Sequence, residues 1–267
     1  MQGKFSALFL GDIMGRPGRR ALAKFLPPLI QKYSPSMVMA NGENAAGGLG
    51  ITEEIGRELL MHVDVLTSGN HIWDKKDALA YLDKDERLLR PANYPPDNPG
   101  MGRYIFKDRW GQKAAVLNLQ GRVFMEAIDC PFRTADRELE NLRAVTPVII
   151  VDFHAEATSE KQALGWYLDG RVSAVIGTHT HVPTADERIL PEGTAYITDV
   201  GMVGGYNSVI GIKRDQAINR FLTARPQRFE PGKDGLVFSA VHIEVDVQSG
   251  KAISIQREMV IEEQSGE

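Results

Sequence analysis

The chain has 267 residues, of which 43% are hydrophobic, 25% are charged and 7% are aromatic. This composition is typical of a globular protein and excludes collagen, a disordered chain and a membrane-spanning protein. The formal net charge is −4 and the pI is about 5.9, so the protein as a whole does not attract nucleic acid or an anionic membrane surface.

The first half of the chain repeats a short apolar run, a polar or glycine-containing loop and a segment of helical period. This βαβ pattern is typical of a layered α/β domain. Thr52 and Asp74 are the expected N-caps of the second and third helices. The predicted strands are residues 5–10, 37–40 and 63–68, and the predicted helices are residues 19–33, 52–61 and 74–82.

The second half contains more strands and closes with a hairpin. Residues 91–102 are rich in Pro, Asn and Gly, which predicts a long surface loop. Two alternating segments around Gln248-Ser249-Gly250 predict the hairpin. The predicted strands are residues 103–107, 114–119, 148–151, 173–176, 195–198, 237–247 and 252–261, and the predicted helices are residues 131–142, with Asp129 as N-cap, and 159–168. Since no linker or repeat interrupts the pattern, we expect one domain over residues 1–267.

No targeting segment or membrane span is expected. The apolar run at residues 5–10 is shorter than the ~7–15 residues of a signal-peptide core, and no other long apolar stretch follows. Cys130 is the only cysteine, which excludes an internal disulfide and a thiolate metal cluster. We therefore expect a cytoplasmic protein, in which six histidines are the scarce reactive side chains.

Polar side chains follow the carboxyl ends of five predicted strands. Such ends share one edge of an open α/β sheet, and this edge is where ligands bind. In chain order the side chains are Asp12, Glu43-Asn44, Asn70-His71, His154 and His179-Thr180-His181. Any one of them alone would be an ordinary turn residue, but together they predict a functional site.

The residue types favour a pair of metal ions. Imidazole, carboxylate and amide groups without thiolate suit Mn, Fe, Co or Zn better than Ca or Mg. The candidate ligands are Asp12, Glu43, Asn44, Asn70, His154, His179 and His181. Seven ligands are too many for one catalytic ion but suit two ions that share a carboxylate. An extended backbone would send the rings of His179 and His181 to one side; the alternative is a strand with two solvated histidines.

The polar blocks resemble those of the calcineurin-like metallophosphoesterases, in the order that this superfamily uses. They are Gly11-Asp12, Asn41-Gly42-Glu43-Asn44, Gly69-Asn70-His71, His154-Ala155-Glu156 and Gly177-Thr178-His179-Thr180-His181. Over nearly the whole chain the sequence is similar to the YmdB-like branch, whose members are phosphodiesterases active on cyclic nucleotides. The resemblance implies a layered α/β/β/α sandwich with mixed sheets and the site at the carboxyl ends of the strands.

The first block departs from the wider superfamily, in which it reads Asp-x-His. Here it is Asp12-Ile13-Met14, and Glu43 stands where the superfamily has a bridging aspartate. Asn44 would take the place of the missing histidine. The resemblance then implies a first ion held by Asp12, Glu43, Asn44 and His181, and a second held by Glu43, Asn70, His154 and His179.

The activity implied by the resemblance is hydrolysis of 2′,3′-cyclic nucleotides and related phosphodiesters to nucleoside monophosphates. Two divalent or mixed-valence ions, Fe or Mn with Zn or Co as alternatives, would activate a bridging hydroxide. The histidine that matches His71 is the proton donor in the resembling family. His62 and His242 are expected in a helix and in the hairpin, without a role.

Two other functions stay open. One is a regulatory protein that acts by partner binding and keeps a vestigial metal site, and the other is a two-metal hydrolase of amides. The expected partners are a small nucleotide or phosphodiester, RNA or RNA-processing proteins and a second copy of the chain, with no membrane.

Other side chains near the predicted edge are weaker candidates. Asp152, Glu156 and Asp199 are candidates for orienting the metal-binding histidines. Arg16 and Arg19 are candidates for a phosphate contact, although a solvated helix start is the favoured alternative, and Trp73 and Tyr206 are candidates for stacking on a base, with packing as the alternative. Gly47-Gly48-Leu49-Gly50 predicts a flexible loop and not a nucleotide cradle.

Overall fold

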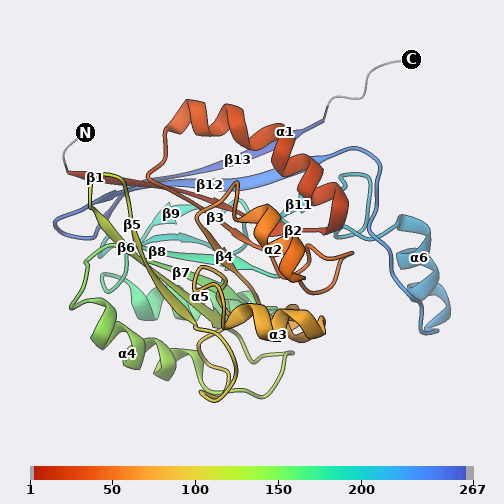
Figure 1. Ribbon diagram of the computed structural model, residues 1–267, viewed down its shortest axis with the longest axis horizontal. Coiled ribbons are helices and arrows are strands. Elements are labelled where there is room, and N and C mark those ends of the chain that lie inside the picture. Colours follow the sequence, from red (N-terminus) through yellow and green to blue (C-terminus); the bar gives the residue numbers. More distant parts are fainter. Residues whose placement is uncertain (1–2, 263–267) are drawn as a thin grey trace.

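The computed structural model describes residues 3–262 and contains two β-sheets that pack face to face, with helices on the outer face of each sheet (Figure 1). The resulting order of layers is α/β/β/α. This arrangement confirms the predicted layered sandwich with mixed sheets.

The first sheet runs in the order β2-β11-β12-β1-β3-β4, and β13 pairs with β12. Its strands are β1 (Lys4–Leu10), β2 (Asp12–Ile13), β3 (Met37–Asn41), β4 (Val65–Thr67), β11 (Met202–Gly204), β12 (Val237–Asp246) and β13 (Ala252–Ile261). β1, β3 and β4 are parallel, whereas β12 is antiparallel to β1. The predicted hairpin is confirmed, because β12 and β13 pair antiparallel.

The second sheet runs in the order β5-β6-β7-β8-β10-β9. Its strands are β5 (Arg103–Lys107), β6 (Lys113–Gln120), β7 (Ile149–His154), β8 (Ala174–Thr178), β9 (Arg188–Ile189) and β10 (Ala195–Ile197). The four inner strands are parallel, and the edge strands β5 and β9 are antiparallel to their neighbours. The carboxyl ends of β6, β7 and β8 therefore lie at one edge of this sheet.

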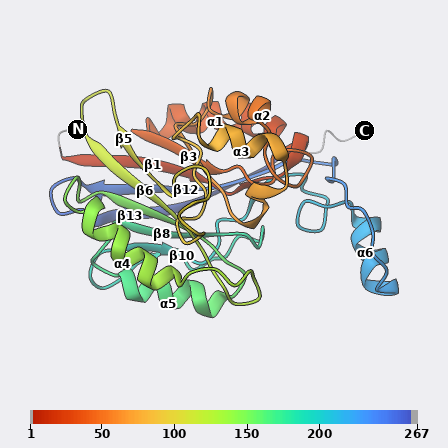
Figure 2. The same cartoon turned by 60° about the horizontal axis from the view of Figure 1, so that its bottom comes forward.

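The helices form the two outer layers. They are α1 (Gly15–Tyr33), α2 (Glu53–Leu59), the 3₁₀ helix η1 (Asn70–Trp73), α3 (Lys76–Leu82), α4 (Pro131–Leu142), α5 (Thr158–Leu168) and α6 (Arg214–Thr223). Helices α1 to α3 cover the first sheet and α4 and α5 cover the second, whereas α6 stands away from the body of the molecule (Figures 1 and 2). No helix within residues 3–262 has both the length and the apolarity needed to cross a membrane.

Strand β1 contributes to two apolar layers, because successive side chains point to opposite faces of a strand. Phe5 and Phe9 lie between the two sheets with Ile150 and Ile176. Leu8 and Leu10 face the outer layer that contains α1. A strand buried on both faces reads as a continuous apolar run, which is why the sequence revealed it.

Several predicted element ends are corrected by the structure. Thr52 caps α2 as predicted, since its side chain accepts a hydrogen bond from the Ile55 N–H (3.3 Å). Lys75, not Asp74, precedes α3, and Cys130, not Asp129, precedes α4; neither of these caps makes a side-chain hydrogen bond. The short strands β2, β9 and β11 and the helix α6 were not predicted, and His62 lies beyond the end of α2.

Candidate metal centre

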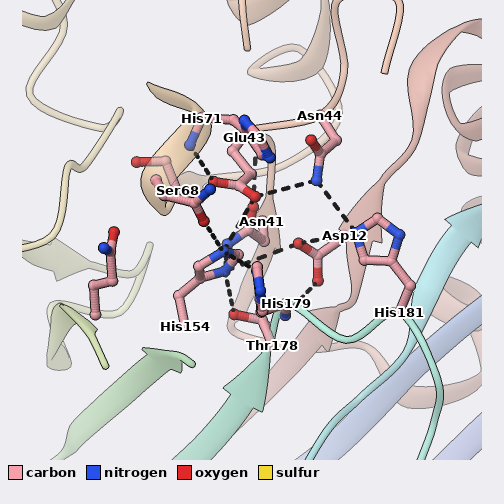
Figure 3. Close-up of polar contacts among 12 residues, drawn as sticks. Asp12, Asn41, Glu43, Asn44, Ser68, His71, His154, Thr178, His179 and His181 are labelled. Atoms are coloured by element: carbon pink, nitrogen blue, oxygen red, sulfur yellow. Dashed lines mark hydrogen bonds and ion pairs between the residues drawn. The ribbon is translucent and has the colours of Figure 1, made fainter. Parts of the chain in front are cut away.

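The predicted ligands converge where strands of both sheets end (Figure 3). Asp12 lies on β2, Glu43 and Asn44 follow β3, Asn70 opens η1 after β4, His154 ends β7, and His179 and His181 follow β8. Asp12, Glu43 and His154 are fully buried, and Asn44 is nearly so. The two sheets therefore bring together residues that are up to 169 positions apart (12 and 181) in the sequence.

His154 is the centre of the more compact half of this cluster. Its Nε2 lies 3.1 Å from Glu43 Oε1, 3.2 Å from Asn70 Oδ1 and 3.0 Å from His179 Nδ1. Donor atoms that bind one ion at about 2.0–2.2 Å lie roughly 3 Å from one another. The spacing of these four side chains therefore fits the predicted second ion.

The other half, around Asp12, is more open. His181 Nε2 lies 3.7 Å from Asp12 Oδ1 and 3.2 Å from Asn44 Nδ2, and the same Nδ2 donates to Glu43 Oε1 (3.2 Å). Asn44 thus presents its amide nitrogen here, and it would have to rotate the amide to offer Oδ1 to a cation. Among residues 3–262, buried Asp12 Oδ1 has no hydrogen-bond partner, and a cation would satisfy it.

The charges of the cluster also fit a cation. Burial raises the pKa of Asp12, and in the described part of the chain no lysine or arginine pairs with Asp12 or Glu43. Burial opposes ionisation of Glu43, but the neighbouring His154 charge lowers the pKa of Glu43 to about 2. Burial likewise opposes protonation of His154, but Glu43 and Asp12 raise the pKa of His154 to about 9. Buried carboxylates need a positive partner, and a cation bound between Asp12 and Glu43 would supply it.

The orientation of His154 is fixed by a hydrogen-bonded chain. The Thr178 hydroxyl donates to Asp152 Oδ1 (2.7 Å), and Thr178 Oγ1 lies 3.0 Å from His154 Nδ1. Because the Thr178 hydroxyl donates its proton to Asp152, Thr178 Oγ1 accepts a hydrogen bond from His154 Nδ1. Nε2 of His154 then faces the other ligands. Metal-binding histidines commonly have such a partner on the far nitrogen. Asp152, one of the candidates for orienting the histidines, thus contacts His154 through Thr178, a residue for which no role was predicted.

The loop with His179 and His181 is not extended, so the predicted reason for their orientation is wrong. The φ angles of His179 and His181 are 103° and 64°, in the left-handed region that most side chains avoid. Asp12 Oδ2 accepts the His179 N–H (3.2 Å) and Asp199 Oδ2 accepts the Thr180 N–H (3.0 Å), which hold this strained backbone. The two rings consequently face different halves of the cluster, one towards His154 and one towards Asp12.

Glu156 and Asp199 contact this loop directly. Glu156 Oε2 lies 3.1 Å from His179 Nε2, and Asp199 forms a buried ion pair with Lys161 (2.6 Å). Burial and the His154 charge lower the pKa of His179 to about 3, which keeps this imidazole neutral and able to bind a cation. Lys161 was not among the predicted residues.

Gly69, which precedes Asn70, lies against the His154 ring. A Cβ atom added at Gly69 would lie 2.0 Å from His154 Cδ2, a distance at which two carbon atoms overlap. The glycine of the Gly-Asn-His block is therefore required by the close approach of backbone and ring. In the sequence, Gly69 directly follows a predicted strand and opens the Gly69-Asn70-His71 block.

His71 lies beside the cluster and not within it. Its backbone N–H donates to Glu43 Oε2 (3.0 Å), and its Nδ1 lies 2.8 Å from Asp74 Oδ2. The side chain of His71 is 31% exposed, in contrast to the buried ligands. This position suits a group that meets a substrate.

The two candidate arginines, Arg16 and Arg19, have different surroundings. Arg19 donates to the Ala45 carbonyl (2.7 Å) and pairs with Glu58, which indicates a structural role. Arg16 is exposed in the first turn of α1. Trp73 packs edge-on against Tyr94.

Comparisons with known proteins agree on one family. The family model described as "YmdB-like protein" matches residues 8–258. The chain is 50% identical over 254 residues to the 2′,3′-cyclic-nucleotide 2′-phosphodiesterase of Bacillus subtilis, covering 95% of this chain and 96% of that protein. A novel phosphatase from Mycoplasma pneumoniae has a similar structure, with a TM-score of 0.92, 37% identity and coverage of 99% of this chain and 96% of the other. A hypothetical protein from Thermus thermophilus gives a TM-score of 0.90, 43% identity and coverage of 97% of this chain and 100% of the other.

Proposed function

Because the chain belongs to the YmdB-like protein family, we propose that it is a dinuclear metal-dependent phosphodiesterase that hydrolyses 2′,3′-cyclic nucleotides and related phosphodiesters. The Bacillus subtilis relative is named for this activity, and the Mycoplasma pneumoniae relative of known structure is described as a phosphatase. The observation that carries the proposal is the convergence of nitrogen and oxygen ligands around the buried carboxylates of Asp12 and Glu43.

We assign the ions to the two sets of residues that the family resemblance implies. One set is Asp12, Glu43, Asn44 and His181, and the other is Glu43, Asn70, His154 and His179. Fe or Mn suits these donors best, with Zn or Co as alternatives. When bound, such ions polarise phosphoryl oxygens and make water more acidic.

His71 performs proton transfer in the proposed reaction. Hydrolysis of a 2′,3′-cyclic phosphate breaks the P–O2′ bond, adds the oxygen of water to phosphorus and requires a proton on the departing O2′. Asp74 holds Nδ1 of His71, so Nε2 is the atom that gives up the proton. Glu43 accepts the backbone N–H of His71 and thereby fixes the proton donor beside the ligands.

The proposal extends to location and partners. The free thiol of Cys130 suits the reducing cytoplasm, where we place the enzyme. Helix α6 exposes Ile218, Phe221 and Leu222, which would suit contact with a second copy of the chain. RNA fragments cleaved by their own 2′-hydroxyl groups end in 2′,3′-cyclic phosphates, so RNA or RNA-processing proteins are the macromolecular partners that this substrate implies.

Metal analysis combined with a direct assay tests the proposal. We expect about two ions per chain by mass spectrometry, as a two-metal site requires. Hydrolysis of 2′,3′-cyclic AMP, followed by ³¹P NMR, should cease when a chelator removes the metal and return when Mn²⁺ is added. A chain that binds fewer than about one ion and hydrolyses no diester in Mn²⁺ would contradict the two-metal mechanism and would favour partner binding instead.

A further inference from the structure

Phe124 is exposed in an unusual backbone conformation. Its side chain is 89% exposed, although phenylalanine is among the residues most often buried. Its φ angle is 63°, in the left-handed region that a bulky non-glycine residue rarely adopts. A conformation of this kind persists only where the surrounding structure imposes it.

A carboxylate beneath the loop anchors the two residues that precede Phe124. Glu160, on α5, is 9% exposed and accepts the backbone N–H of Arg122 on both of its oxygens (3.1 Å each). One of these oxygens also accepts the N–H of Val123 (3.1 Å). The two residues that precede Phe124 are thus hydrogen-bonded to helix α5. The loop that carries the exposed Phe124 ring is therefore anchored to the body of the protein.

The loop of residues 121–128 is tied at its first end to the candidate metal centre. The Gly121 N–H donates to the carbonyl oxygen of His154 (2.9 Å). His154 is a proposed metal ligand, so the loop begins directly beside the site. Phe124 lies three residues further along.

Residues near the other end of the loop are linked, through Gln120, to the aromatic pair Tyr94 and Trp73, of which Trp73 lies close to His71 in the sequence. Gln120 Nε2 donates to Glu126 Oε2 (2.9 Å), and Gln120 Oε1 accepts the hydroxyl of Tyr94 (3.2 Å). The Tyr94 ring packs edge-on against Trp73, at a centroid distance of 5.2 Å, and Trp73 is two residues beyond His71. The loop therefore connects the ligand His154 to the side of the site that holds the proposed proton donor.

We propose that Phe124 stacks on the base of the substrate and that the loop of residues 121–128 forms a nucleobase-binding subsite. This inference rests on the proposed function and deepens it, because it assigns the recognition of the nucleoside part. Every base offers a π-face, so stacking on a single aromatic ring suits purines and pyrimidines alike. Trp73 and Tyr94 already pack on each other, whereas Phe124 presents its ring to solvent. A loop that is already ordered loses little conformational entropy when the base binds.

The test compares F124A, the restoring variant F124W and the control F221A on two cyclic diesters. Phe221 is similarly exposed (84%) but lies on α6, which stands away from the body (Figure 1). The substrates are 2′,3′-cyclic AMP and glycerol 1,2-cyclic phosphate, which has the same five-membered ring and no base. We expect F124A to raise KM for 2′,3′-cyclic AMP by about tenfold, the loss typical of one stacked base, with little change in kcat. F124W should restore KM, F221A should resemble the wild type, and no variant should change the rate on the glycerol diester.

Three outcomes would overturn the subsite. The first is an unchanged KM of F124A for 2′,3′-cyclic AMP. If light scattering also shows that F124A forms a smaller oligomer than the wild type, Phe124 belongs to a contact between copies of the chain. An equal loss on both diesters would assign Phe124 a structural role. A wild type inactive on both diesters would remove the proposed function itself, and with it the subsite, and this result is visible before any variant is compared.

Discussion

Nδ1 of His71, the second residue of the 3₁₀ helix η1, lies 2.8 Å from Oδ2 of Asp74, the residue that follows this helix. The backbone N–H of His71 is bound at the same time to Glu43 Oε2 (3.0 Å). One short turn therefore fixes a partly exposed imidazole, its carboxylate partner and a buried carboxylate of the candidate metal centre relative to one another.

Replacing His71 by glutamine should lower kcat on 2′,3′-cyclic AMP by about 10²- to 10³-fold, the usual contribution of a general acid. The metal content should not change, because the His71 ring is not among the converging ligands. Steady-state kinetics and metal analysis on the same preparation check both statements. If the variant loses its metal together with its activity, His71 acts as a ligand and not as a proton donor.

Replacing Asp74 by asparagine should lower kcat by about tenfold, less than the His71 variant, because orientation is weakened while the imidazole remains. Asparagine keeps the shape of the side chain and removes its charge. In the double variant H71Q/D74N, no further loss beyond that of H71Q is expected, since Asp74 acts through His71. Independent, multiplying losses in the two variants would show that Asp74 acts by another route.

Replacing Gly69 by alanine should abolish metal binding and activity. The added Cβ would overlap the His154 ring, so the ring or the backbone must move and the ligand spacing is lost. Gly42 is a suitable control next to Glu43, since a Cβ there would lie 3.3 Å from the flexible end of Leu66. Metal content and thermal melting of G69A and G42A measure the difference. A G69A variant with full metal content would disprove the requirement for close approach.

Much of the fold could be predicted because the longer inner strands, such as β1, β6 and β7, are rich in apolar residues. The strand at β1 was found within one residue of its start, since both faces are buried. β2 and β11 have only two and three residues and therefore no period to detect; they exist because Asp12 and Met202 pair across the sheet. Helix α6 has an apolar stripe, but the stripe faces solvent and was not recognised.

The candidate site could be located because parallel strands end at a common edge, so the residue after each strand was informative. Residues that support the site could not be found in this way. Thr178 matters because Asp152 and His154 lie on either side of its hydroxyl, and these contacts join two strands. In the sequence, Lys161 is an ordinary charged residue of a predicted helix. The structure shows that it is buried and paired with Asp199.

Replacing Lys161 by methionine should destabilise the fold by about 3–5 kcal/mol, the cost of leaving a buried charge without its partner. Lys161 Nζ lies 2.6 Å from Asp199 Oδ2 and 2.7 Å from the Thr178 carbonyl, and both side chains of the pair are 1% exposed. The double variant K161M/D199N should recover part of this loss, because the uncompensated charge is gone. Urea unfolding of the single and double variants measures both effects; a double variant as unstable as K161M would contradict the charge explanation.

His242 should make the protein less stable in mild acid. Its Nε2 lies 2.8 Å from Ser6 Oγ, and its ring stacks on Tyr33 at a centroid distance of 4.0 Å. Burial lowers the pKa of His242 below the usual value of 6.5, and the positive charge of Lys32 adds to this effect, whereas Glu244 and Glu258 oppose it.

The sign of the effect follows from proton uptake. As the pH falls below about 6.5, the unfolded chain binds a proton at this histidine before the folded chain does, so the free energy of unfolding decreases with falling pH. This contribution to stability is present above the unfolded pKa and is lost as the pH falls through the lowered pKa of the folded protein.

H242Q cannot titrate and should lose less stability between about pH 8 and about pH 5 than the wild type does. The variant H62Q, at an exposed histidine outside the hairpin, should behave as the wild type. Urea midpoints at the two pH values measure the difference, and parallel changes in H242Q and the wild type would show that His242 titrates equally in both states.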